Sequence, residues 1–141
     1  SMIVEPGDID SVFYNDSKGD STKILEVDKY VKMNGPRVYQ FAVDIIPKTI
    51  NKILRDNNLT LDDIDVIIPH QANKRIVESI IKEMNLSDDK VILNIDRYGN
   101  TSAASIPITI AEYKEEYKHL KTILIVGFGG GFTWGASSLK I

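Results

Sequence analysis

The sequence predicts one α/β domain, built on a mostly parallel, five-stranded sheet with helices on both faces. Three observations lead to this class. Short apolar runs alternate with longer segments whose apolar residues recur at helical spacing. The short runs are apolar almost throughout, which is typical of strands covered on both faces. Hydrophobic residues make up 43% of the 141 residues and charged residues 26%, the ordinary balance of a globular domain with a substantial core.

The first elements expected are a strand and a long helix. Residues 9–14 combine β-branched and aromatic side chains, as strands do. Residues 38–57 carry an apolar stripe at helical spacing, after a break at residues 34–36. Pro47 lies inside that stripe. Because proline lacks the amide donor, it marks either the start of the regular helix or a kink in it.

The middle of the chain predicts a second strand and a second helix. Thr60 and Asp63 have the spacing of a capping box, which indicates one short helical turn. Residues 65–68 form a short apolar run and indicate a buried strand. Apolar residues at helical spacing follow at once and predict a helix over residues 71–84.

The C-terminal part predicts three strands and one helix, which completes the order β-α-β-α-β-α-β-β. The strands are expected at residues 91–95, 122–126 and 133–141, the last one antiparallel because its connection is too short for a crossover. The helix is expected from residue 102 to about 117. Its first half is small and apolar almost all round, which is normal for a helix buried on every side, whereas its second half is charged and must meet solvent.

The composition excludes several functions. The net charge of -3 argues against a general nucleic-acid binder. No apolar run approaches the roughly 20 residues that cross a bilayer, and no signal peptide opens the chain, so we expect a cytoplasmic domain with no membrane partner. Cysteine is absent, which excludes disulfides, thiolate metal sites and a cysteine nucleophile in this chain.

Two polar loops at strand ends form the candidate site. His70 follows the strand at residues 65–68 and opens a helix, whose exposed N–H groups favour an anion or a developing oxyanion. Asn100 follows the strand at residues 91–95. The carboxyl ends of parallel strands meet at one edge of a sheet, so a neutral imidazole N–H and a carboxamide N–H can both donate to one oxygen. A structural histidine and an ordinary Gly-Asn turn are the alternatives.

A glycine-rich loop is the third candidate, Gly127-Phe128-Gly129-Gly130-Gly131-Phe132. It is not a dinucleotide fingerprint, because Phe132 stands where the last glycine is required, and no Gly-Lys-Ser/Thr follows to make a phosphate loop. Four glycines in six residues indicate backbone brought close to a ligand or another domain. A plain tight turn is the alternative, and it needs fewer glycines.

The remaining polar candidates are weaker. The basic pair Lys74-Arg75 can meet phosphates or can be solvated surface. His119 lies in a charged segment at a helix end and is expected at the surface. No second histidine lies near His70, so no metal site is expected.

Four stretches together carry a resemblance to a known family. They are Met33-Asn34-Gly35, Pro69-His70-Gln71-Ala72-Asn73-Lys74-Arg75-Ile76, Asp96-Arg97-Tyr98-Gly99-Asn100-Thr101-Ser102-Ala103-Ala104-Ser105 and Gly127-Phe128-Gly129-Gly130-Gly131-Phe132-Thr133-Trp134-Gly135. In order and spacing they resemble β-ketoacyl-acyl-carrier-protein synthase III. The resemblance covers only the C-terminal half of that family's protein. It implies one half of a thiolase-like fold, whose element order the residue patterns predict independently.

The resemblance implies a condensing enzyme. The family's enzymes transfer an acyl group, commonly acetyl, from coenzyme A to a cysteine. They then condense it with malonyl-acyl-carrier protein and release carbon dioxide, which initiates fatty acid biosynthesis. By resemblance, His70 and Asn100 hydrogen-bond the malonyl thioester oxygen, and Gly130 donates its backbone N–H to the tetrahedral acyl intermediate.

The resemblance also implies substrate-binding residues. Asn34, Gly35, Ala72 and Asn73 correspond to positions that line the pantetheine tunnel, and Arg75 to a basic position that meets the acidic surface of the carrier protein. The implied substrates are a coenzyme A thioester and a phosphopantetheine-carried acyl group. No other cofactor is implied.

One departure limits this chain by itself. The nucleophilic cysteine belongs to the family's N-terminal half, and this chain has none. The first hypothesis is therefore the C-terminal domain of a condensing enzyme, spanning residues 9–141 after a leading segment at 1–8. Ser1-Met2, typical of a tag remnant, favours it. The second is a natural partner subunit or a module that binds carrier protein or coenzyme A. The upstream gene sequence would decide between them. An in-frame half that contains a cysteine favours the first hypothesis, and a stop codon favours the second.

The helix expected from residue 102 also predicts an oligomeric state. In the family it packs between the two halves, so in an isolated half its small apolar face is exposed, and large apolar patches drive association. We expect a homodimer that partly mimics the missing half. A clean monomer in sedimentation at high concentration would count against it.

Overall fold

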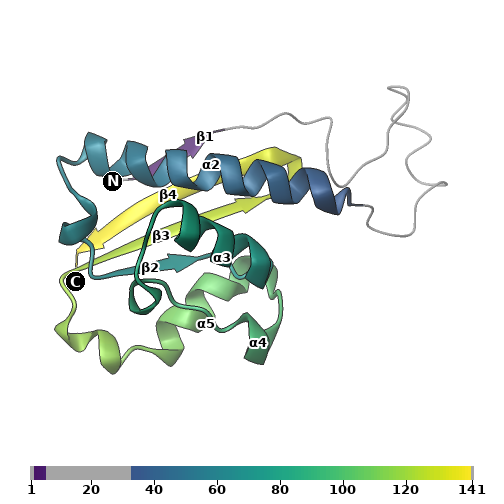
Figure 1. The fold of residues 1–141 in the computed structure, drawn as a ribbon. Coiled ribbons are helices and arrows are strands. Elements are labelled where there is room, and N and C mark those ends of the chain that lie inside the picture. Colours follow the sequence, from purple (N-terminus) through teal and green to yellow (C-terminus); the bar gives the residue numbers. More distant parts are fainter. Residues whose placement is uncertain (1, 6–32, 141) are drawn as a thin grey trace, which may run out of the picture.

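The computed structural model describes residues 2–5 and 33–140 (Figure 1). The helices and strands are β1 (Met2–Glu5), α2 (Gly35–Asp56), β2 (Val66–Pro69), α3 (Lys74–Glu83), α4 (Ile95–Tyr98), α5 (Ser105–Glu112), β3 (Thr122–Gly129) and β4 (Thr133–Lys140). Short 3-10 helices lie between them at Leu61–Asp63, Asp88–Lys90, Ser102–Ala104, Glu116–His119 and Gly130–Phe132. The strand expected at residues 9–14 falls outside the described residues, whereas β1 lies in the leading segment, where no strand was expected.

The sheet has the strand order β1-β4-β3-β2. Strand β2 runs parallel to β3, and β4 runs antiparallel to both of its neighbours, β3 and β1. The closing antiparallel strand is confirmed. The described part of the chain forms a mixed, four-stranded sheet, however, and does not show the mostly parallel, five-stranded sheet that the sequence predicted.

The strand expected at residues 91–95 is absent as a strand. Val91 forms one parallel bridge with Ile67, and the N–H of Ile92 donates to the carbonyl of Ile67 at 3.1 Å. Beyond this point the Gln71 side chain takes over, because its amide has the same donor and acceptor as a peptide group. Its Nε2 donates to the Ile92 carbonyl at 3.0 Å, and its Oε1 accepts from the N–H of Asn94 at 3.0 Å. The chain then turns into α4.

Helices cover both faces of the sheet, as predicted. Side chains that alternate along β2 and β3 point to opposite faces. On one face they pack against α2 and α3, in a core that includes Ile46, Ile50, Ile53, Ile67, Ile76, Val77, Ile80, Leu124 and Val126. On the other face Val66, Ile68 and Ile123 pack with residues of α5, among them Ile106 and Ile110.

Helix α2 starts earlier than the sequence predicted and passes through its proline. Asn34 caps it, with Oδ1 accepting from the N–H of Arg37 at 3.2 Å. Pro47 is buried inside the helix, so it does not mark the start. In the described part of the chain, no helix is long and apolar enough to cross a membrane.

The segment after Asn100 differs most from the expected buried helix. A 3-10 turn precedes α5, which ends at Glu112, five residues before the predicted end. Ala103, Ala104 and Pro107 are exposed, as the sequence predicted for this apolar face in an isolated half, so the helix is not buried on every side in this chain taken alone. His119 is exposed, as expected. The homodimer stays a prediction, for which the exposed alanines and proline provide the apolar surface.

Candidate active site

His70 lies at the edge of the sheet where β2 and β3 end. Its N–H donates to the carbonyl of Val126 at 2.7 Å, which extends the parallel ladder by one residue. A Cβ atom built on Gly127 would lie 3.4 Å from the Cβ of His70, so the glycine-rich strand end passes directly beside the histidine. The imidazole meets Phe128 edge to face, with 5.8 Å between ring centroids. His70 thus follows the end of β2 and packs against the end of β3 beside it.

The imidazole of His70 is half-buried and neutral. Burial lowers its pKa below the usual value, because a desolvated ring disfavours the charged form. Its Nδ1 lies 2.6 Å from the hydroxyl oxygen of Ser105, the first residue of α5. In the described part of the chain Nε2 has no hydrogen-bond partner. The ring therefore has one anchored nitrogen and one that is free for a ligand.

Asn100 lies at the same edge as His70. Its Nδ2 donates to the carbonyl of Ala72 at 3.4 Å, and the N–H of Ala72 donates to the carbonyl of His70 at 2.9 Å. Its Oδ1 accepts from the N–H of Ser102 at 3.0 Å. The predicted meeting of the two loops is therefore confirmed. The prediction that Asn100 follows a strand is wrong, because α4 and the left-handed Gly99, at φ +68°, precede it.

The glycine loop connects β3 to β4 through a strained turn. Gly131 adopts φ +74° and Phe132 φ +49°. A bulky residue rarely adopts such a backbone, and strain of this kind persists only where packing holds it. The ring of Phe132 is buried against Phe41 at 4.4 Å, and the Arg37 guanidinium lies 5.4 Å from its centroid. These contacts bring the start of α2 to the glycine loop, at the end of the sheet where β3 ends (Figure 1).

The predicted substrate-binding residues lie at the starts of α2 and α3 and in the loop that follows His70. Asn34 and Asn73 are helix N-caps, and the Oδ1 of Asn73 accepts from the N–H of Arg75 at 2.9 Å. Helix α3 begins at Lys74 and not at residue 71 as expected, so His70 is four residues from the helix end, in a short loop. Arg75 is exposed. The N–H groups that open α3 are therefore not presented at His70 itself.

Sequence reasoning missed the buried polar side chains behind His70. Gln71, Asn94, Ser105 and Thr109 are each at most 3% exposed. The single hydroxyl proton of Thr109 is shared between the Ser105 carbonyl, at 2.8 Å, and the Oδ1 of Asn94, at 3.1 Å, and Asn94 Nδ2 donates to Glu112 at 2.9 Å. The available signal was the spacing of Ser105 and Thr109, one turn apart in an otherwise apolar helix. These groups bond to one another because burying them unpaired is costly.

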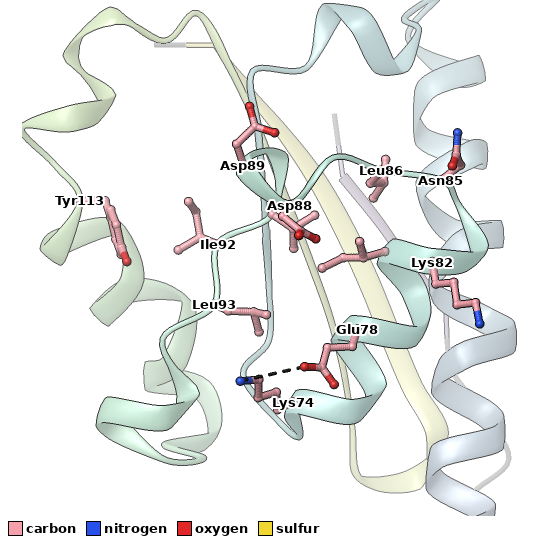
Figure 2. A pocket seen from close by; sticks show the side chains of 12 residues that line it. Lys74, Glu78, Lys82, Asn85, Leu86, Asp88, Asp89, Ile92, Leu93 and Tyr113 are labelled. Carbon is pink, nitrogen blue, oxygen red and sulfur yellow. Dashed lines mark ion pairs between the residues drawn. The ribbon is translucent and has the colours of Figure 1, made fainter.

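A separate groove of about 680 Å³ lies between α3 and residues 85–93 (Figure 2). Lys74 and Glu78 pair across 4.0 Å on one side of it, and Asp88 and Asp89 lie on the other. None of the residues that the sequence singled out as catalytic lines this groove. The groove is therefore distinct from the candidate site around His70.

Similarity to known proteins decides the family. Residues 54–141 match the family model described as 3-oxoacyl-[acyl-carrier-protein] synthase III C terminal. The chain belongs to this synthase III family. The resemblance noted in the sequence is thereby confirmed.

The synthase III relatives are longer than this chain. β-Ketoacyl-[acyl-carrier-protein] synthase III of Acholeplasma laidlawii is 55% identical over 129 residues, which are 92% of this chain and 42% of the relative. The Staphylococcus aureus synthase III is 48% identical over 129 residues, 88% of this chain and 41% of the relative. The synthase III structure from Thermus thermophilus superposes with a TM-score of 0.87 at 30% identity, over all of this chain and 45% of that one. The chain spans less than half the length of each of these proteins.

Proposed function

We propose that this chain is the C-terminal domain of a synthase III that condenses an acyl-coenzyme A with malonyl-acyl-carrier protein and thereby initiates fatty acid biosynthesis. The observation that carries the proposal is that Asn100 lies at the same edge of the sheet as the neutral His70, with its carboxamide bonded to the loop that follows the histidine. Membership of the synthase III family supports it.

His70 and Asn100 provide the neutral hydrogen-bond donors that stabilise an enolate. Loss of carbon dioxide from a malonyl thioester leaves a carbanion whose negative charge is shared with the thioester oxygen. His70, through its ring N–H, and Asn100, through Nδ2, donate hydrogen bonds to that oxygen. Preorganised donors aimed at developing charge lower the barrier, and neutral ones do so without transferring a proton. The carbanion then attacks the carbonyl carbon of an acyl-cysteine carried by the N-terminal half, and the tetrahedral intermediate breaks its carbon–sulfur bond to release the cysteine thiolate.

The other predicted residues have places in the same scheme. The backbone N–H of Gly130, together with that of the cysteine, stabilises the tetrahedral intermediate formed on the acyl group. Asn34, Gly35, Ala72 and Asn73 border the path of the pantetheine arm. Arg75 is exposed in the first turn of α3, where it contacts the acidic surface of the carrier protein.

This polypeptide alone is expected to give no condensation, because it has no cysteine on which an acyl-enzyme can form. The measurement is ketoacyl product from acetyl-coenzyme A and malonyl-carrier protein. A chimera in which this chain replaces the matched part of the A. laidlawii relative is expected to turn over.

The intact relative is the positive control, and the chimera with its nucleophilic cysteine changed to alanine is the blank. Turnover by this chain alone would contradict the predicted need for a second half. A folded chimera that binds malonyl-carrier protein but forms no product would contradict the proposed roles of His70 and Asn100. A stop codon directly upstream in the gene would instead favour a partner subunit that supplies the same two side chains to another chain.

A further inference from the structure

Ser105 contacts the nitrogen of His70 that lies away from the proposed ligand. Its hydroxyl oxygen lies 2.6 Å from His70 Nδ1 and accepts a hydrogen bond from the N–H of Gln71 at 3.3 Å. The residue is 3% exposed. In the described part of the chain these are the two hydrogen-bond partners of the hydroxyl.

The direction of the short bond follows from counting protons. A backbone N–H can only donate, so the serine oxygen is the acceptor toward Gln71. The hydroxyl has one proton of its own, and a buried proton donor needs an acceptor. His70 Nδ1 is the remaining partner. A nitrogen that accepts a hydrogen bond has no proton, and the proton of the neutral ring then lies on Nε2.

The position of Ser105 is itself fixed. Its carbonyl accepts from the hydroxyl of Thr109 at 2.8 Å, which in turn bonds Asn94. The Gln71 side chain is anchored to the carbonyl of Pro69 at 2.9 Å and to that of Ile92 at 3.0 Å. Hydrogen bonds therefore fix both segments that meet at this contact, the start of α5 with Ser105 and the loop with Gln71.

We propose that Ser105 is a positioning residue that holds His70 as the Nε2–H tautomer and so presents that N–H to the substrate oxygen. Its catalytic meaning rests on the proposed function, whereas the tautomer is a property of this chain alone. The opposite assignment, with Nδ1–H donating to the serine oxygen, would leave the buried hydroxyl proton without an acceptor and Nε2 without a proton to donate.

Nitrogen-15 NMR of the histidine rings in the full 141-residue chain tests the assignment. The chain has two histidines, and the exposed His119 is an internal reference for a solvated ring. At neutral pH we expect His70 to show a protonated Nε2 and a bare Nδ1. A protonated Nδ1, or equal amounts of the two neutral forms, would overturn the proposal.

Variants test whether Ser105 is the cause. In Ser105→Ala the ratio of the Nε2–H to the Nδ1–H form is expected to fall about tenfold, the typical worth of one hydrogen bond. Ser105→Thr keeps the hydroxyl and is expected to restore the ratio. Thr49→Val removes a buried hydroxyl from α2 that bonds the Ile45 carbonyl and contacts neither His70 nor Ser105, and the ratio is expected to stay as in the wild type.

An unchanged ratio in a folded Ser105→Ala would overturn the role of Ser105. If that variant does not fold, the wild-type spectrum and Ser105→Thr still decide the tautomer. An Nε2–H tautomer in this chain together with an inactive chimera would retain the tautomer and refute the proposed function. An active chimera together with an Nδ1–H ring in this chain would retain the proposed function and refute the tautomer.

Discussion

Replacing Gln71 with leucine is expected to lower the free energy of unfolding by about 3 kcal/mol, because a buried N–H or carbonyl that loses its partner costs roughly 1–3 kcal/mol. Gln71 is 1% exposed, and its amide bonds the N–H of Asn94 and the carbonyls of Ile92 and Pro69. Leucine fills a similar volume but can bond none of them. The expected result is a drop in Tm of roughly 10 °C.

Urea unfolding followed by circular dichroism measures this change. The only other glutamine, Gln40, is exposed on α2, and Gln40→Leu is the matched control, expected within about 0.5 kcal/mol of the wild type. A loss below 1 kcal/mol in Gln71→Leu would show that the Gln71 amide does not replace strand pairing at residues 92–94. Because Gln71 adjoins His70, a large loss of unfolding free energy in Gln71→Leu would show that a residue beside the candidate site also stabilises the fold.

Replacing His70 with alanine in the chimera is expected to lower the condensation rate by about 10²–10³-fold, as the removal of one oxyanion donor typically does. The reason is the loss of the ring N–H from the enolate oxygen. Transfer of the acyl group from coenzyme A to the cysteine is expected to fall less, because in the proposed scheme His70 acts on the malonyl oxygen. Measuring acyl-enzyme formation and malonyl decarboxylation separately distinguishes the two steps.

The second histidine offers the control for that experiment. His119→Ala, at an exposed position in the 3-10 helix Glu116–His119, is expected to leave both steps unchanged. Asn100→Ala is expected to lower decarboxylation as well, and its effect and that of His70→Ala should not add, because both donors act on one oxygen. Equal losses in both steps for His70→Ala would contradict the assignment to the enolate.

Local patterns predicted much of this fold. The apolar run at 65–68 and the one at 122–126 became β2 and β3, and they pair in parallel, as expected for strands joined by a long helical connection. The amphipathic segment after His70 became α3. These predictions succeeded because the spacing of apolar residues shows which face of a helix or strand is buried. That spacing is a local property, visible within a few residues of sequence.

The strand expected at residues 91–95 shows the limit of such patterns. Its composition is that of a strand, yet only Val91 bridges Ile67, and the Gln71 side chain pairs with the backbone that follows. The start of α3 at Lys74, by contrast, is set locally, because the Asn73 side chain caps the helix by accepting from the N–H of Arg75. A side chain that replaces a peptide group cannot be recognised from periodicity, because it depends on which segments meet in space.

The sequence by itself determined that a histidine ends a buried strand of an α/β sheet and that an asparagine loop follows the next apolar run, because buried strands and amphipathic helices are local patterns with a known topology. It also determined that this chain brings no cysteine to them. Only the tertiary structure decided how the histidine is held. Burial between the ends of β2 and β3 keeps the ring neutral, and α5 brings the Ser105 hydroxyl to Nδ1 from 35 residues away. Desolvation and long-range hydrogen bonds arise from packing and leave no local pattern in the sequence.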